Sequence, residues 1–250
     1  MRRITPHLWF DREAKEAVQF YTSLFPGSRT LSVTTLHGVP TPTGDSDTIS
    51  WELGGHPFIA INAGPLFKFN PSISFMVNFD PSRDPGARAN LEAAWKGLSE
   101  GGTALMPLGS YFFSDLYGWM QDRYGLSWQL ILTKPEGEER PFVIPSLMFA
   151  GGAIGRAEEA MDFFCSIFPD GKRGITARYG EGQEPDREGT IMFADFHIMG
   201  TWLAAMDSAR MPDLAFNEAV SLMIPCETQK EIDFYWEKLS AVPEAEQCGW

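Results

Sequence analysis

Residues 20–26, Phe-Tyr-Thr-Ser-Leu-Phe-Pro, recur at residues 163–169 as Phe-Phe-Cys-Ser-Ile-Phe-Pro. In both copies an amphipathic run leads into the segment and a proline closes it. This is the pattern of a short surface helix that ends at the proline. Because a repeat of this kind indicates a duplicated chain, the two halves have to be compared before any motif is interpreted.

Four further landmarks recur in the same order along the chain. They are residues 4–10 with 144–149, 69–77 with 216–224, 95–99 with 236–240, and 117–119 with 248–250. Matched landmarks in one order indicate an internal duplication. We therefore predict a first domain at residues 1–133, a charged linker at 134–141 and a second domain at 142–250.

The alternation of apolar and polar residues predicts two β-α-β-β-β units in tandem within the first half. The predicted strands are 4–10, 28–36, 48–53, 57–62, 72–79, 103–108, 111–120 and 127–132, and the helices are 12–25, with Asp11 as N-cap, and 87–100. The second half repeats this plan, with strands at 143–149, 174–179, 190–197, 201–206 and 219–225 and helices at 156–168 and 228–240. Its final residues, Cys248-Gly249-Trp250, correspond to the next-to-last strand of the first half. The second domain is therefore expected to lack its last strand.

Composition and charge exclude several classes of partner. The formal net charge of −13 opposes binding to nucleic acid or to an anionic membrane surface. The three cysteines have neither zinc-site spacing nor the pairing of a disulfide framework, which favours a reducing compartment. The N-terminus has no apolar signal segment, and we find no apolar run of about 18 residues. We expect a cytoplasmic protein.

The first half resembles the PhnB-like family, whose label is 3-demethylubiquinone-9 3-methyltransferase-like. The matching segments are residues 4–10, 16–21, 24–28, 67–70, 98–102, 118–119 and 125–129. This resemblance implies the vicinal-oxygen-chelate superfamily of glyoxalases, bleomycin-resistance proteins and dioxygenases. It implies an α+β fold of tandem βαβββ modules that form curved mixed sheets, in two such domains. It also implies that the two units of one half form an eight-stranded cup that holds the ligand.

Enzymes of that superfamily hold a divalent metal in the cup with His or Glu from the first, fourth, fifth and eighth strands. Carried onto this chain, those positions are His7, Ala60, Ser72 or Ser74, and Gln129; in the second half they are Ser146, Ala205 and Ser221. A catalytic metal generally needs three protein ligands. We therefore predict no cofactor, and His7 and Gln129 as the ligands if a metal does bind. Glu52 and His56 are expected to be solvated surface groups rather than replacements.

Other chemistries have little support in the sequence. S-adenosylmethionine enzymes usually carry a Gly-rich turn after their first strand, but here Asp11-Arg12-Glu13-Ala14 follows it. The segment Gly151-Gly152-Ala153-Ile154-Gly155 could hold an anion, but a simple loop is favoured. A Gly-x-Ser-x-Gly elbow does not occur. The methyltransferase label is therefore an alternative without a supporting motif.

What remains is a cup lined by rings, amides and one histidine, which suits a small, partly apolar ligand. The predicted ligand-binding residues are His7, Trp9, Ser74, Phe112, Trp119 and Gln129, although such rings can also belong to an ordinary core. Three hypotheses stay open: metal-free binding of a small molecule, a metal-dependent glyoxalase- or dioxygenase-type lyase or oxidoreductase, and a structural or interaction module. The duplication also predicts an internal pseudo-dimer, with a homodimer as the alternative.

Overall fold

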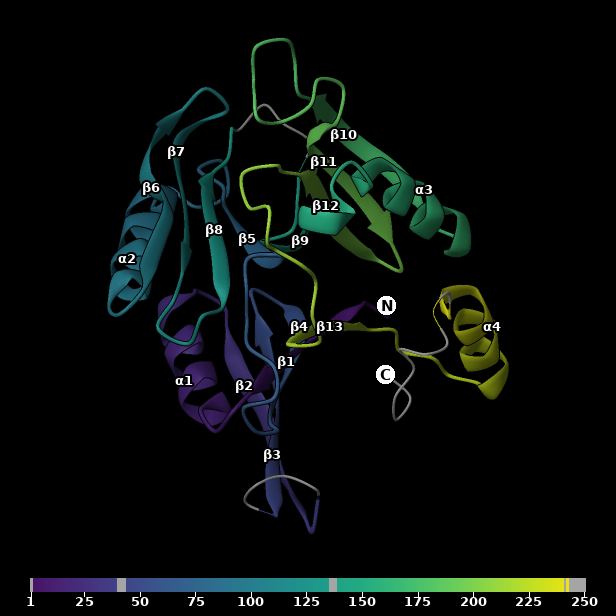
Figure 1. Ribbon diagram of the computed structural model, residues 1–250. Helices are drawn as coiled ribbons and strands as arrows, with labels where there is room; N and C mark the ends of the chain where they lie inside the picture. Colours follow the sequence, from purple (N-terminus) through teal and green to yellow (C-terminus); the bar gives the residue numbers. More distant parts are fainter. Residues whose placement is uncertain (1, 40–43, 135–138, 241, 243–250) are drawn as a thin grey trace.

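A computed structural model describes residues 2–39, 44–134, 139–240 and 242 of the chain (Figure 1). The elements of the first half are β1 (Thr5–Phe10), α1 (Ala14–Leu24), β2 (Arg29–His37), β3 (Asp45–Leu53), β4 (His56–Asn62), β5 (Ile73–Phe79), α2 (Ala87–Ser99), β6 (Thr103–Tyr111), β7 (Ser114–Gln121) and β8 (Ser127–Leu132). The second half contributes β9 (Val143–Phe149), the 3₁₀ helix η1 (Gly151–Ala153), α3 (Ala157–Ile167), β10 (Lys172–Arg178), β11 (Ile191–Ile198), β12 (Thr201–Asp207), β13 (Val220–Met223) and α4 (Gln229–Leu239).

The order of elements confirms the predicted β-α-β-β-β units, but two local predictions are wrong. Asp11 is not the N-cap of α1; Glu13 takes that position, and Asn62 Oδ1 accepts the Ala14 N–H at 2.9 Å. Phe112 lies in the turn between β6 and β7 rather than within a strand. The predictions for 248–250 fall outside the described residues. Among the helices that are described, none is long and apolar enough to cross a membrane.

The strands form two sheets, and each sheet takes strands from both halves. The five-stranded sheet has the order β13-β1-β4-β3-β2, and the eight-stranded sheet has the order β10-β11-β12-β9-β5-β8-β7-β6. The expectation that both units of the first half share one eight-stranded cup is therefore wrong. The eight-stranded sheet instead joins the second unit of the first half to the first unit of the second half through the antiparallel pair β5 and β9 (Figure 1).

Reciprocal hydrogen bonds join matching positions of the two halves. Asn70 Nδ2 donates to the Ala215 carbonyl at 3.0 Å, and Asn217 Nδ2 donates to the Lys68 carbonyl at 2.9 Å. Each asparagine also accepts, through its side-chain oxygen, the backbone N–H two residues further on. The Phe-Asn landmark of the repeat is therefore the point where each half holds the other.

The strand register follows the same symmetry. Where β5 meets β9, Ser74 lies opposite Ser146; where β1 meets β13, His7 lies opposite Ser221. The pair Ser74–Ser146 is therefore equivalent, by the repeat, to the pair Ser221–His7. Each of these pairs joins a strand of the first half to a strand of the second.

The helix that carries the repeated segment forms for local reasons. The residues Ala14, Ala17, Val18 and Tyr21 lie on one side at helical spacing and are buried. The proline at 26 stops the helix, and Gly27 then adopts a φ of 69°, which a glycine reaches without a Cβ clash. The buried stripe packs α1 against β3 and β4.

The main core joins the two sheets of the first half around a buried carboxylate. Asp122 accepts hydrogen bonds from Tyr21 Oη at 2.7 Å and from Trp128 Nε1 at 2.9 Å, and from two backbone N–H groups. The Tyr21 ring lies 5.0 Å from the Trp128 ring and stacks at 5.8 Å on Trp51. Burial raises the pKa of Asp122, and the hydrogen bonds oppose that rise. This cluster connects α1 to β8 and so fixes the five-stranded sheet against the eight-stranded sheet.

Candidate functional site

Side chains of the eight-stranded sheet alternate between two faces. One face, which includes Phe75 and Trp128, belongs to the main core with the buried stripe of α2. The opposite face crosses the pairing of β5 with β9, and we call it the seam face. Its central residues are Ser74 and Met76 on β5, Tyr117 and Trp119 on β7, Ser127 and Gln129 on β8, and Ile144, Ser146 and Met148 on β9.

A chain of buried hydrogen bonds runs across the middle of the seam face. Tyr117 Oη donates to Gln129 Oε1 at 2.7 Å, and Gln129 Nε2 donates to Ser74 Oγ at 2.8 Å. Ser74 lies opposite Ser146 in the register of β5 and β9. Ser146 is 1% exposed, and its Oγ has no hydrogen-bond partner among the described residues. The relay Tyr117–Gln129–Ser74 therefore ends beside a hydroxyl with unused hydrogen-bonding capacity.

The Tyr117 hydroxyl is protonated, as the first donor of this relay must be. Burial raises the pKa of Tyr117 well above its ordinary range. The phenol therefore stays protonated and neutral across physiological pH. Since Gln129, Ser74 and Ser146 are also neutral, the relay offers hydrogen bonds without a net charge.

Rings and thioethers surround the relay. Trp119 Nε1 donates to Ser127 Oγ at 2.8 Å, which orients the indole beside Gln129. Tyr117, Trp119 and Met148 form one apolar cluster with Met206 and with residues of the segment that follows β12. Thioether side chains repack readily, so this wall can adapt to the shape of a ligand.

The segment between β12 and β13 covers part of the seam face. Met211 and Leu214 pack against the apolar cluster on that face. The carbonyls of Pro212 and Leu214 approach Gly151 so closely that a Cβ there would meet them, and Gly151 has a φ of 51°. Glycine is required at that position, and it sets where the covering segment lies.

His7 and Trp9 do not lie on the seam face. Both are on β1 in the five-stranded sheet, where His7 lies opposite Ser221 and beside Ile59. Burial lowers the pKa of His7 to about 4, so the imidazole is neutral near pH 7. Trp9 Nε1 donates to the Gly64 carbonyl at 2.8 Å. The predicted six-residue site is thus divided: the structure brings Ser74, Trp119 and Gln129 together and places His7 and Trp9 elsewhere.

Phe112 does not line either sheet face. It lies in the turn between β6 and β7, 78% of its surface is exposed, and its ring contacts Phe113 at a centroid distance of 5.1 Å. The prediction that it lines a cup assumed a strand running through residue 112. The strands end on either side of Phe112. A turn residue does not follow the two-residue alternation of a strand, so the face of its side chain could not be predicted from that alternation.

A groove of about 390 Å³ lies at the end of β1 and includes Trp9. Its lining includes two acidic residues, Asp11 and Glu13, and two basic residues, Lys68 and Arg123. The Arg123 guanidinium lies 4.0 Å over the ring of Phe20, which is not part of the groove lining. The sequence interpretation missed this groove, although the run Phe67-Lys68-Phe69, which contributes to it, was visible as part of the family resemblance.

The residues at the expected metal positions do not fit a metal site. Ala60 is buried in the main core beside Leu8, so it does not share a face with His7. His7 and Gln129, the two predicted ligands, lie in different sheets. In the part of the chain that the structure describes, no three His, Cys, Asp or Glu side chains come close enough to hold an ion.

The proposed replacements do not rescue that site. Glu52 pairs with Arg29 at 2.7 Å. The expectation that His56 is a solvated surface group is wrong, since it is only 4% exposed and its ring contacts Phe58 at 5.5 Å. Burial, followed by the charge of Arg3, lowers the pKa of His56 to about 4.

The glycine-rich segment after β9 is already occupied by a side chain of the protein. Residues 151–153 form η1, and Asp207 Oδ1 accepts the N–H groups of Gly155 at 2.8 Å and Ala157 at 3.2 Å. The other carboxylate oxygen accepts the Ile191 N–H at 3.0 Å. Within the segment, the Ala153 and Ile154 N–H groups donate to the carbonyls of Ala150 and Gly151, so three of its donors already have partners in the protein, which favours a loop over an anion site.

Three of the residues that complete the seam face were not predicted as ligand contacts: Tyr117, Ser127 and Ser146. Tyr117 could have been found, because it alternates with Trp119 along one strand. Ser146 could not, because its place opposite Ser74 depends on pairing between strands of the two halves.

Comparison with known proteins agrees with this architecture. The family model described as 3-demethylubiquinone-9 3-methyltransferase matches residues 2–131 and again residues 141–250. The PhnB protein from Bacillus cereus is 34% identical, over 53% of this chain and 100% of that chain, with a TM-score of 0.46. Glyoxalase I from Zea mays is 12% identical, over 88% of this chain and 71% of that chain, with a TM-score of 0.55. A search of curated proteins found no significant match.

The chain belongs to the 3-demethylubiquinone-9 3-methyltransferase family, with two copies of the family domain in one polypeptide. The likeness to glyoxalase I concerns the fold alone.

Proposed function

We propose that this member of the family binds a small, uncharged, partly apolar molecule on the seam face and places an oxygen of that molecule at Ser146. The observation that carries the proposal is the buried relay Tyr117–Gln129–Ser74, which ends beside the unpartnered hydroxyl of Ser146. A buried polar group without a partner costs about 1–3 kcal/mol. A carbonyl or hydroxyl oxygen of a ligand would remove that cost.

The surroundings of the relay define the class of ligand. Its polar groups are neutral, so they favour an uncharged molecule over an anion or a cation. The indole of Trp119 and the thioethers of Met148 and Met206 favour a flat ring over an aliphatic chain. A single aromatic ring with neighbouring oxygen substituents meets both conditions.

The family description names a demethylubiquinone, whose ring has this chemistry. Our proposal for this chain takes the ring of that molecule as the ligand class and does not include methyl transfer. In the glycine-rich segment after β9, the Gly155 N–H donates to Asp207 and the Ala153 and Ile154 N–H groups donate to backbone carbonyls. The metal-dependent lyase or oxidoreductase reading also loses support, because the donors at its expected positions lie in different sheets.

A ligand can enter only if the segment between β12 and β13, which covers part of the seam face, moves. Met211 and Leu214 contact the apolar cluster of the seam face, and both are only partly buried. A ring that binds between Trp119 and Ser146 would take the place of these two side chains. Binding should therefore protect or reposition residues 208–218 without moving the strands.

Calorimetric titration with 2-methoxyphenol tests the proposal, with 4-hydroxybenzoate as the charged counterpart. We expect saturable 1:1 binding of the neutral ring and at least tenfold weaker binding of the anion. Ser146→Ala should weaken binding about fivefold to tenfold, which corresponds to the roughly 1–1.5 kcal/mol of one hydrogen bond.

Ser221→Ala is the matched control, because Ser221 belongs to the equivalent strand pair of the five-stranded sheet, where it lies opposite His7. It should leave the affinity unchanged. If Ser221→Ala weakens binding and Ser146→Ala does not, the ligand binds at the five-stranded sheet, which contradicts the proposal. A panel of neutral rings that shows no binding at millimolar concentration would also contradict it.

A further inference from the structure

Two connections leave the eight-stranded sheet at the same end. Because β11 is antiparallel to both β10 and β12, the chain leaves β10, enters β11 and leaves β12 at one end of these strands. The β10–β11 connection, residues 179–190, forms the loop at the top of Figure 1. It therefore lies at the same end of the sheet as the start of the covering segment.

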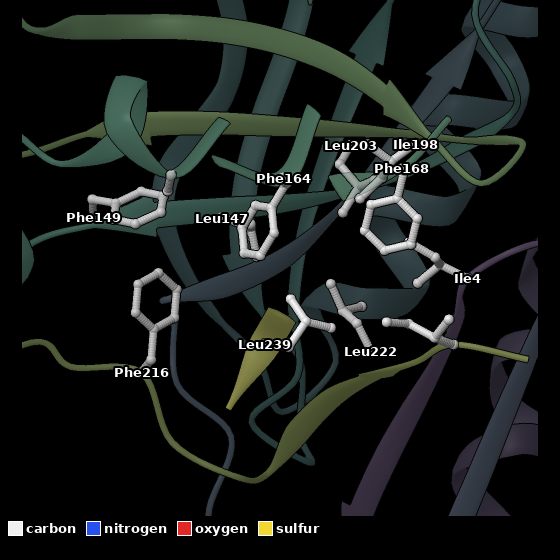
Figure 2. A pocket seen from close by; sticks show the side chains of 12 residues that line it. Ile4, Leu147, Phe149, Phe164, Phe168, Ile198, Leu203, Phe216, Leu222 and Leu239 are labelled. Carbon is white, nitrogen blue, oxygen red and sulfur yellow. The ribbon is translucent and has the colours of Figure 1, made fainter. Parts of the chain in front are cut away.

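The covering segment is fixed at both of its ends. At its start, the Ser208 N–H donates to the Phe149 carbonyl at 3.0 Å. Near its far end, the Phe216 ring packs edge-on against the Phe149 ring at 5.1 Å between centroids, and Figure 2 shows the two rings next to each other. The residues between these anchors, 209–214, include both side chains that cover the seam face.

A buried carboxylate of the β10–β11 connection holds this stretch of the covering segment. The side chain of Asp186 is 1% exposed, although the two residues on either side of it are exposed. Its Oδ1 accepts the Ala209 N–H at 2.7 Å, and Arg210 Nε lies 2.8 Å from its Oδ2. The Arg210 guanidinium also donates to the Glu184 carbonyl at 3.3 Å. Two consecutive residues of the covering segment are thus bound to one connection.

These contacts stabilise the covered form of the seam face. A buried carboxylate is stable only when polar or charged groups compensate it, and the covering segment supplies the Ala209 N–H and the Arg210 guanidinium. Hydrogen bonds to a charged group are roughly twice as strong as those between neutral groups. Met211 and Leu214 are only partly buried, so their apolar contacts contribute less than full burial would.

We infer that Asp186 is an autoinhibitory latch, which holds the covering segment where Met211 and Leu214 occupy the ligand site of the seam face. This inference rests on the proposed function, in which a ring displaces these two side chains. A ligand that binds only the open form has an apparent dissociation constant equal to its intrinsic constant divided by the open fraction. Weakening the latch therefore tightens ligand binding, whereas loss of the Ser146 hydroxyl weakens it.

Hydrogen exchange of the full chain without ligand tests the latch itself. Asp186→Ala removes one charge-assisted hydrogen bond and one ion pair, so exchange across residues 210–214 should accelerate about tenfold. Asp186→Asn keeps an acceptor for the Ala209 N–H and should accelerate it only about threefold. Arg210→Gln should act like Asp186→Asn, and because the Arg210 side chain is 58% exposed this change should leave the fold intact. Glu188→Gln is the matched control, since it removes the same charge from an exposed position of the same connection and should change nothing.

Calorimetric titration of the same variants with 2-methoxyphenol tests the inhibitory role. Asp186→Ala should bind the ring more tightly than the wild type, by the factor of about ten by which its hydrogen exchange accelerates. Stopped-flow kinetics should place this gain in the association rate and leave the dissociation rate unchanged. Arg210→Gln should tighten binding about threefold, and Glu188→Gln should bind as the wild type does.

The two measurements separate the latch from the ligand site. Unchanged hydrogen exchange in Asp186→Ala and in Arg210→Gln would overturn the latch, whatever the ring does. Accelerated exchange with unchanged or weaker binding of the ring would overturn the inhibitory role, because the ligand and the covering segment would not compete. Accelerated exchange with no binding of the ring by any variant would contradict the proposed function, and the inhibitory role would fall with it.

Discussion

Replacing Gln129 by Leu should destabilise the protein, because Gln129 is the central member of the buried relay. The amide is 1% exposed and makes hydrogen bonds of 2.7 Å with Tyr117 and 2.8 Å with Ser74. Leucine has a similar size but leaves a buried phenol and a buried hydroxyl without that partner. Each such group costs about 1–3 kcal/mol, so we expect a loss of about 2–4 kcal/mol after the gain from the apolar side chain.

The double variant Gln129→Leu with Tyr117→Phe separates the relay from general packing. Removing the phenol oxygen takes away one orphaned group, so the double variant should be more stable than Gln129→Leu alone by about 1–2 kcal/mol. Urea denaturation followed by circular dichroism measures all three free energies of unfolding. A loss below about 0.5 kcal/mol for Gln129→Leu, or no recovery in the double variant, would refute the reasoning.

Three further predictions test other parts of the structure. His56→Leu should reduce the loss of stability between pH 6.5 and 4. The pKa of His56 in the folded state is about 4, below the ordinary 6.5, so the unfolded state of the wild type takes up the proton first and its stability falls by up to roughly 1.4 kcal/mol per pH unit. Urea denaturation at several pH values measures this fall, and identical slopes for the two proteins would contradict the prediction. Gly118→Ala should destabilise by about 1–3 kcal/mol because a Cβ there meets the Trp95 ring, whereas Gly152→Ala, with open space around it, should be near neutral in thermal denaturation. Gln129→Glu should bind no zinc, nickel or manganese in calorimetry, since His7 is in the other sheet; stoichiometric binding lost again in a His7→Ala background would prove that view wrong.

The parts of the fold that depend on local chemistry could be predicted from the sequence. The strand predicted at residues 4–10 agrees with β1 to within one residue. The strands predicted at 48–53 and 57–62 agree with β3 and β4 to within three residues, and Gly54 and Gly55 adopt positive φ in the turn between them. Helices α1 and α3 agree with their amphipathic runs to within two residues at each end.

The composition of the sheets could not be predicted in this way. Pairing of β5 with β9 joins strands from different halves, and each β-α-β-β-β unit has the same local pattern whichever neighbour it pairs with. His7 and Gln129 were therefore placed in one cup although they lie in separate sheets. Ser74, Trp119 and Gln129 were grouped correctly in space because β5, β7 and β8 belong to a single unit.

The buried histidine was missed for a related reason. His56 follows a glycine turn, where exposed residues are typical, but its ring is covered by contacts that include Phe58 and a backbone hydrogen bond to Ile4. A turn residue is exposed only if no other element packs over the turn. Such contacts arise between segments distant in the sequence.

Diffraction from crystals of the protein grown with 2-methoxyphenol would test the central claim most directly. We expect electron density for the ring on the seam face, with an oxygen within hydrogen-bond distance of Ser146 Oγ and with Met211 and Leu214 displaced. Density confined to the groove at Trp9 and Lys68, or to the side of the five-stranded sheet that carries His7, would contradict the account.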